Sequence, residues 1–151
     1  MITEGEKAPA FSGKDQAGQV RKLSDYRNKK LVIYFYPQDD TPTCTIQACN
    51  VRDNYTLLKE KGIEIIGISP DDVGSHRKFT DKFHLPFPII ADPNRKIIEK
   101  FGVWGEKTMF GNKYMGVLRT TFLVNEKGIV HKVIRRPKNK DHVNEILSFW
   151  K

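Results

Sequence analysis

Apolar runs alternate with amphipathic segments along this chain, in the order expected of an α/β protein. Residues 31–36 and 63–68 are mostly aliphatic or aromatic, which is typical of strands buried on both faces of a sheet. The rest of the pattern predicts a short strand at residues 88–90, helices at 72–83, 94–101 and 141–150, and a hairpin formed by 119–124 and 129–134 with its turn at 125–128.

A further helix is predicted directly after the first buried strand. Thr41 suits the N-cap position, and Pro42 suits the first helical position. We expect this helix to run to residue 61, because Gly62 can end it. Cys44 then occupies about the third helical position, where unpaired backbone N–H groups and the helix dipole favour a negatively charged thiolate.

The order of the elements predicts the architecture. A strand, a helix and a strand in succession imply a parallel pair, and the later hairpin implies an antiparallel part. We therefore predict an α/β fold of thioredoxin-like arrangement, with a mixed central β-sheet flanked by helices on both faces. The chain has 151 residues with no internal repeat or linker, so residues 1–151 are expected to form one domain.

The chain is basic, with a net charge of +8. The charge is dispersed, and its densest stretch, residues 131–140, lacks the Phe, Tyr or Trp that would stack on a nucleic-acid base. We expect no nucleic-acid partner; a basic binding module built on residues 131–140 is the alternative. No apolar run approaches the ~20 residues of a membrane span. Residues 1–7 hold no apolar signal region, so we expect a cytoplasmic protein.

Two cysteines, Cys44 and Cys49, are the candidate reactive groups. A chain of this length can fold without disulfides, so a close pair suggests chemistry, although Cys44 alone could be a buried, inert side chain. In an intact α-helix, Cα atoms five residues apart are separated by ~8.5 Å. A disulfide needs roughly 4.4–6.8 Å. The two cysteines can therefore bridge only if the first turns of the helix unwind.

Other polar residues give weaker signals. The acid pairs at 39–40 and 71–72 are interpreted as turns and helix starts rather than as a catalytic carboxylate pair. No metal site is expected, because the histidines occur without a second one at the spacing of zinc ligands; they are His76, His84, His131 and His142.

The stretch that ends at Cys44 resembles the active-site motif of peroxiredoxins. Pro37, Thr41 and Cys44 fit the pattern P-x-x-x-T-x-x-C, and Cys49 follows at the spacing of the bacterioferritin-comigratory-protein, or Q-type, subgroup. The resemblance extends over about residues 4–150, through further matches at 34–37, 66–69, 101–107 and 119–124. Thr43 stands where many relatives have glycine, a departure that concerns the shape of the pocket.

The resemblance implies a role for each matching residue. Cys44 matches the peroxidatic cysteine, which attacks hydrogen peroxide or an alkyl hydroperoxide and becomes a sulfenic acid. Thr41 matches the threonine that hydrogen-bonds the peroxide, and Pro37 matches the proline that shields the pocket from water. Arg119 matches the arginine that stabilises the thiolate and polarises the peroxide. Cys49 matches the resolving cysteine, whose disulfide with Cys44 is reduced by a dithiol protein such as thioredoxin.

The same resemblance implies no metal, haem or flavin cofactor. It also implies a monomer, because the cysteine near the C-terminus that obligate-dimer peroxiredoxins use is missing. Trp104 and Gly105 are expected in a loop near the site. A thiol–disulfide oxidoreductase on the same fold is the rival enzyme class, and the lack of a C-x-x-C motif counts against it.

Overall fold

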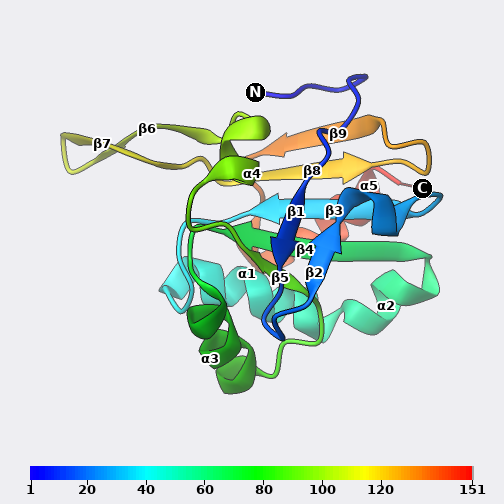
Figure 1. The fold of residues 1–151 in the computed structure, drawn as a ribbon, viewed down its shortest axis with the longest axis horizontal. Coiled ribbons are helices and arrows are strands. Elements are labelled where there is room, and N and C mark those ends of the chain that lie inside the picture. The colour runs from blue at the N-terminus through cyan, green and yellow to red at the C-terminus, as the bar shows by residue number, and fades with distance from the viewer. Residues whose placement is uncertain (151) are drawn as a thin grey trace.

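The structure is a computed structural model that describes residues 1–150; Lys151, the last residue of the predicted domain, lies outside the described residues. In the described range, strands form one mixed sheet and a separate two-stranded hairpin (Figure 1). Neighbouring strands of the sheet follow the order β2 (Val20–Lys22), β1 (Ser12–Lys14), β5 (Ile89–Ala91), β4 (Ile63–Ser69), β3 (Lys30–Phe35), β8 (Thr120–Val124) and β9 (Val130–Arg135). The pairs β3–β4 and β4–β5 are parallel, and the other pairs are antiparallel.

Each face of the sheet carries its own apolar core, because successive side chains of a strand point to opposite faces. Leu31 and Phe35 pack on one face with α4 (Lys96–Lys100). Val32 and Tyr34 pack on the other face. The helices that contribute to this second core are α1 (Pro42–Asp53), α2 (Tyr55–Glu60), α3 (Val73–Phe83) and α5 (His142–Ser148). The predicted mixed sheet with helices on both faces is confirmed.

The predicted helix over residues 41–61 is wrong in one respect, because it is two helices. α1 ends at Asp53, and Asn54 has the non-helical angles φ −116° and ψ 14°. The Asn54 side chain donates a hydrogen bond to the Asn50 carbonyl over 2.8 Å, in competition with the backbone bonds that would continue the helix. α2 then begins, and Gly62, at φ +71°, follows its end as predicted.

A β-hairpin that the sequence pattern did not predict extends from the body of the protein (Figure 1). It consists of β6 (Trp104–Met109) and β7 (Asn112–Val117). Trp104 and Gly105 were expected in a loop and instead begin β6. Most hairpin residues are exposed, and Phe110 at its tip is 96% exposed, so the hairpin has no buried stripe for a pattern to reveal. The short strands β1 and β2 were missed for the same reason, since their residues are mostly exposed.

The sheet brings the start of α1 close to a distant segment. β8 runs antiparallel to β3, with Thr120 opposite Phe35. Arg119 directly precedes β8 and therefore lies at the edge where β3 ends and the chain turns into α1. Two 3-10 helices, η1 (Leu23–Tyr26) and η2 (Asn139–Asp141), complete the described elements. Within residues 1–150, no helix is long and apolar enough to cross a membrane.

Candidate active site

Cys44 lies in the first turn of α1, third after the N-cap Thr41, as predicted. The side chain is 1% exposed and packs in the apolar core that contains Tyr34. The helix is regular from its start, since the Thr45 N–H donates to the Thr41 carbonyl over 2.9 Å. The sulfur is therefore buried, and it lies at the end of the helix where the dipole favours negative charge.

A guanidinium group contacts this sulfur. Arg119 Nη2 donates to Cys44 Sγ over 3.2 Å, and Arg119 Nη1 donates to Gln47 Oε1 over 2.9 Å. The fork of the guanidinium thus joins two side chains of α1, three residues apart on one face of the helix. A cation beside the sulfur is one feature of reactive cysteines.

Gln47 is the site residue that the sequence reasoning missed. It is fully buried, and its Oε1 fixes the orientation of the Arg119 guanidinium. Its Nε2 is buried with no hydrogen-bond partner in residues 1–150. The available signal was its position three residues after Cys44, which places both side chains on the same face of α1.

Thr41 occupies the N-cap position, but its side chain does not cap the helix. Its hydroxyl donates to the Gln38 carbonyl over 3.0 Å. A hydroxyl that donates to a carbonyl keeps its lone pairs as acceptors. The backbone N–H groups of Thr43 and Cys44 are in the first turn, so no earlier residue of the helix can pair with them. Pro37 is half-buried at the start of the same loop.

Cys49 is on the same helix as Cys44, and both thiols are free. Cys44 is buried and Cys49 is partly buried. This arrangement agrees with the geometric expectation that an intact helix keeps the two sulfurs apart. The structure therefore has the dithiol form of the protein.

Burial and the nearby charges determine the protonation of two side chains beside the site. Burial, and then the Cys44 sulfur, raises the pKa of Tyr34 well above its usual value, so this phenol stays neutral. Burial, and then the Arg119 charge, lowers the pKa of His142 from 6.5 to about 3. His142 is therefore neutral at physiological pH, and its Nε2 is 2.9 Å from the Thr121 hydroxyl.

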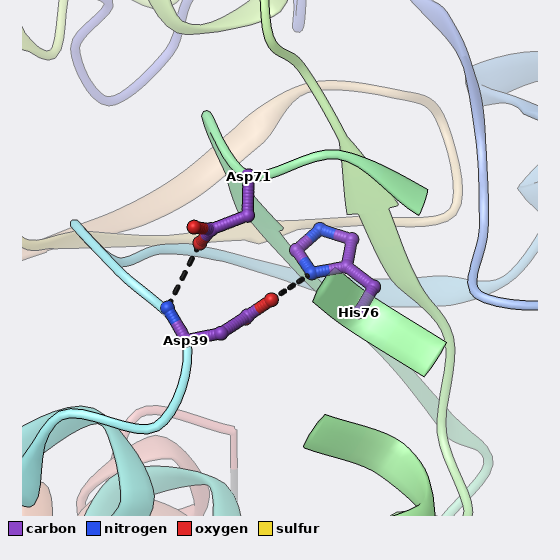
Figure 2. A group of neighbouring side chains, drawn as sticks. All are labelled: Asp39, Asp71 and His76. Carbon is purple, nitrogen blue, oxygen red and sulfur yellow. Dashed lines mark hydrogen bonds and ion pairs between the residues drawn. The ribbon is translucent and has the colours of Figure 1, made fainter. Parts of the chain in front are cut away.

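The acid pairs of the sequence have different environments. Asp72 accepts from the Ser75 N–H at the start of α3, as the helix-start interpretation predicted. Asp39 and Asp71 instead form a cluster with His76 (Figure 2), which that interpretation did not anticipate. One ligand atom from each lies within 4.8 Å of the others, a spacing that a metal ion could use. His76 Nδ1 bonds the Asp39 carboxylate, and the Asp39 N–H donates to Asp71 Oδ2, so the cluster is explained as a polar network.

A buried cysteine at a helix start, bonded by an arginine that directly precedes β8, is typical of a thiol-based redox enzyme. Comparison with known proteins identifies its family. The model of the AhpC/TSA family matches residues 4–133. Peroxiredoxin Bcp of Bacillus subtilis is 46% identical over 150 residues, and Peroxiredoxin Bcp of Escherichia coli is 38% identical; each alignment covers 99% of this chain and 96% of the relative.

Solved structures lead to the same family. A variant of PrxQ from Xylella fastidiosa superposes with a TM-score of 0.91 at 28% identity, over 98% of this chain and 94% of that one. The bacterioferritin comigratory protein of Xanthomonas campestris superposes with a TM-score of 0.85 at 31% identity, over 91% of this chain and 88% of that one. The chain belongs to the AhpC/TSA family and is a thioredoxin-fold peroxiredoxin, a thiol-dependent peroxidase. The resemblance drawn from the sequence is confirmed.

Proposed function

We propose that Cys44 is the residue that attacks the peroxide. The observation that carries this proposal is the 3.2 Å bond from Arg119 Nη2 to Cys44 Sγ. The thiolate attacks one peroxide oxygen, so that an S–O bond forms and the O–O bond breaks. The leaving oxygen takes a proton and departs as water or an alcohol, and Cys44 becomes a sulfenic acid. The guanidinium and the first-turn N–H groups stabilise the charge on the leaving oxygen without reorganising.

Two residues of the preceding loop act around the peroxide in this proposal, since Thr41 orients it and Pro37 shields it from water. The Thr41 hydroxyl donates its hydrogen bond to the Gln38 carbonyl, so its oxygen is available to accept a hydrogen bond from the peroxide O–H. Pro37 has no backbone N–H and limits the access of water to the pocket.

In the second step, Cys49 attacks the sulfenic sulfur of Cys44. An intramolecular disulfide forms, and the oxygen leaves as water. The start of α1 must unwind for this step, because the two positions are too far apart in an intact helix. A dithiol protein, thioredoxin, then reduces the disulfide by exchange and returns both thiols.

The substrates we propose are hydrogen peroxide and alkyl hydroperoxides. The solved Xanthomonas relative is described as having alkyl peroxide reduction activity, which supports the second of these substrates. We further propose that residues 1–151 act as one domain and as a monomer, since both cysteines of the cycle are on one helix. A cycle that returns to free thiols suits a reducing compartment, so the cytoplasm is the proposed location.

The test measures peroxide consumption coupled to thioredoxin and thioredoxin reductase. We expect Cys44→Ser to be inactive with hydrogen peroxide and with an alkyl hydroperoxide. Cys49→Ser should consume about one equivalent of peroxide and then stop, because its sulfenic acid cannot pass to a disulfide. Turnover by Cys44→Ser would exclude Cys44 as the nucleophile. Full turnover by Cys49→Ser would exclude the internal disulfide.

A further inference from the structure

Polar side-chain contacts hold the chain on each side of the segment that carries both cysteines. Asp39 comes just before this segment and Asn50 just after it. Residues 40–49, between them, include the first two turns of α1. The two flanking side chains contact different parts of the protein, and both sets of contacts join residues far apart in the sequence.

Asp39 is fixed through its side chain and its backbone. The carboxylate accepts from Tyr36 Oη over 2.6 Å, from Ser75 Oγ over 2.8 Å and from His76 Nδ1 over 2.6 Å. The Asp39 N–H donates to Asp71 Oδ2 over 2.8 Å (Figure 2). A carboxylate only accepts, so the proton of His76 is on Nδ1. These bonds connect the loop to the end of β3, the end of β4 and the first turn of α3.

Asn50 is fixed by two bonds to the C-terminal part of the chain. Its Nδ2 donates to the Lys140 carbonyl over 3.1 Å, and its Oδ1 accepts from the Val143 N–H over 2.9 Å. The Val143 N–H is in the first turn of α5 and has no helical partner, so Asn50 satisfies it. The second half of α1 is thereby joined to α5.

The polar side-chain contacts within residues 40–49 are local, exposed, or made by Arg119. Asp40 has a left-handed backbone, with φ +58°, and its carboxylate meets Lys82 in an exposed ion pair. Thr41 bonds the nearby Gln38 carbonyl. Arg119 makes two part-buried bonds to this segment, and one of them ends on the sulfur that the reaction changes.

We propose that Asp39 and Asn50 are two anchors that confine the unwinding of α1 to residues 40–49 when the Cys44–Cys49 disulfide forms. The inference rests on the proposed function for the reason that this disulfide must form. A residue in a helix rises ~1.5 Å, whereas an extended residue spans up to ~3.6 Å. An unwound segment is therefore longer than the distance between its fixed ends requires. The extra length lets the two sulfurs come together while the rest of the fold stays in place.

Two backbone amides report directly on the anchors. The Asp39 N–H belongs to the first anchor and the Val143 N–H to the second. The experiment measures amide hydrogen exchange by NMR in the dithiol form and in the disulfide form. We expect the amides of residues 45–49 to exchange at least about 100-fold faster in the disulfide form. The two anchor amides should change by less than about threefold. The proposal would be overturned if the exchange rate of either anchor amide rose by the same factor as the rates of residues 45–49.

The disulfide is prepared twice, once with hydrogen peroxide and once with the thiol oxidant diamide, and intact mass confirms the loss of two hydrogens. If only diamide forms the bond, the proposed peroxidase cycle fails while the anchors are still tested. If diamide forms no bond, residues 40–49 cannot unwind between fixed ends, and the inference is overturned.

Variants of His76 separate positioning from general stability. His76→Ala removes the donor to Asp39, and the Asp39 amide should exchange roughly tenfold faster or more in the disulfide form. His76→Asn retains a donor near the position of Nδ1 and should restore protection. Asp72→Ala is the control, because it removes the cap of α3 and retains the donor of His76 to Asp39. Equal loss of Asp39 protection in Asp72→Ala would mean that α3 stability, and not the His76 bond, fixes the loop.

Discussion

Replacing Arg119 by lysine tests the contact on which the proposed chemistry depends. The guanidinium bonds Cys44 Sγ through one nitrogen, at 3.2 Å, and Gln47 Oε1 through another, at 2.9 Å. An ammonium group is a single point charge and cannot reproduce both bonds from the same backbone position. A hydrogen bond to a charged group contributes about 1.5–3 kcal/mol. Its loss from the transition state should slow the attack on peroxide roughly 10- to 150-fold.

The assay measures the first step alone. In a Cys49→Ser background no disulfide follows the sulfenic acid, so the first phase after rapid mixing with excess peroxide gives the rate constant of Cys44 itself. Arg21→Lys is the matched control, since Arg21 is also partly buried and bonds an acid, Asp15, over 2.8 Å. The control should react within about twofold of the parent, because it is remote from the reacting sulfur.

The result that would refute this reasoning is a normal rate. If Arg119→Lys, folded at the assay temperature, oxidises within about twofold of the parent, then the guanidinium bond does not govern the reactivity of Cys44. A rate lowered equally in Arg119→Lys and Arg21→Lys would also contradict it, since that outcome would reflect a general loss of stability.

Three further changes have expected outcomes. Gln47→Ala should slow the same first step by up to about tenfold through the guanidinium it orients, and Gln47→Glu, which retains the acceptor, should stay closer to the parent. Because the folded pKa of His142, about 3, lies below its ordinary value of 6.5, the unfolded state binds the proton more readily. The free energy of unfolding should therefore fall by about 2 kcal/mol when the pH is lowered from 7 to 5. Urea unfolding of His142→Gln should lack that loss, and the control His84→Asn should keep it. In thermal unfolding, Phe101→Ala should lower the free energy of unfolding by about 3–5 kcal/mol, because Phe101 is in the core. Phe110→Ala should lower it by less than about 0.5 kcal/mol, because Phe110 is at the exposed tip of the hairpin.

The elements predicted correctly carry a signal within their own stretch of sequence. β3 and β4 are buried on both faces, so each reads as an apolar run. The start of α1 was predicted because Thr41 and Pro42 carry the positional preferences of a helix start. Both signals are local, so neither requires knowledge of what packs against the element.

The elements that were missed depend on features without such a signal. The interruption at Asn54 comes from one side chain that competes for a carbonyl of the preceding turn, and many helical asparagines make no such bond. The strands β6 and β7 pair with each other and bury little, so no apolar alternation marks them. Gln47 was missed because a polar residue on a helix is usually exposed, and this one is buried against an arginine that is 72 residues away in the sequence.

The site therefore divides into a part that the sequence determines locally and a part that only the topology determines. Cys44 lies at the N-terminal, positive end of the dipole of its own helix, so the nucleophile can be proposed from its immediate neighbours. The contact from Arg119 crosses 75 residues and exists because β8 lies antiparallel beside β3 with Thr120 opposite Phe35. A shift of that register by one residue would turn the residues of β8 to the opposite face. The register of this one strand pair thus decides whether the sulfur has a cationic partner, and no local pattern near Cys44 encodes it.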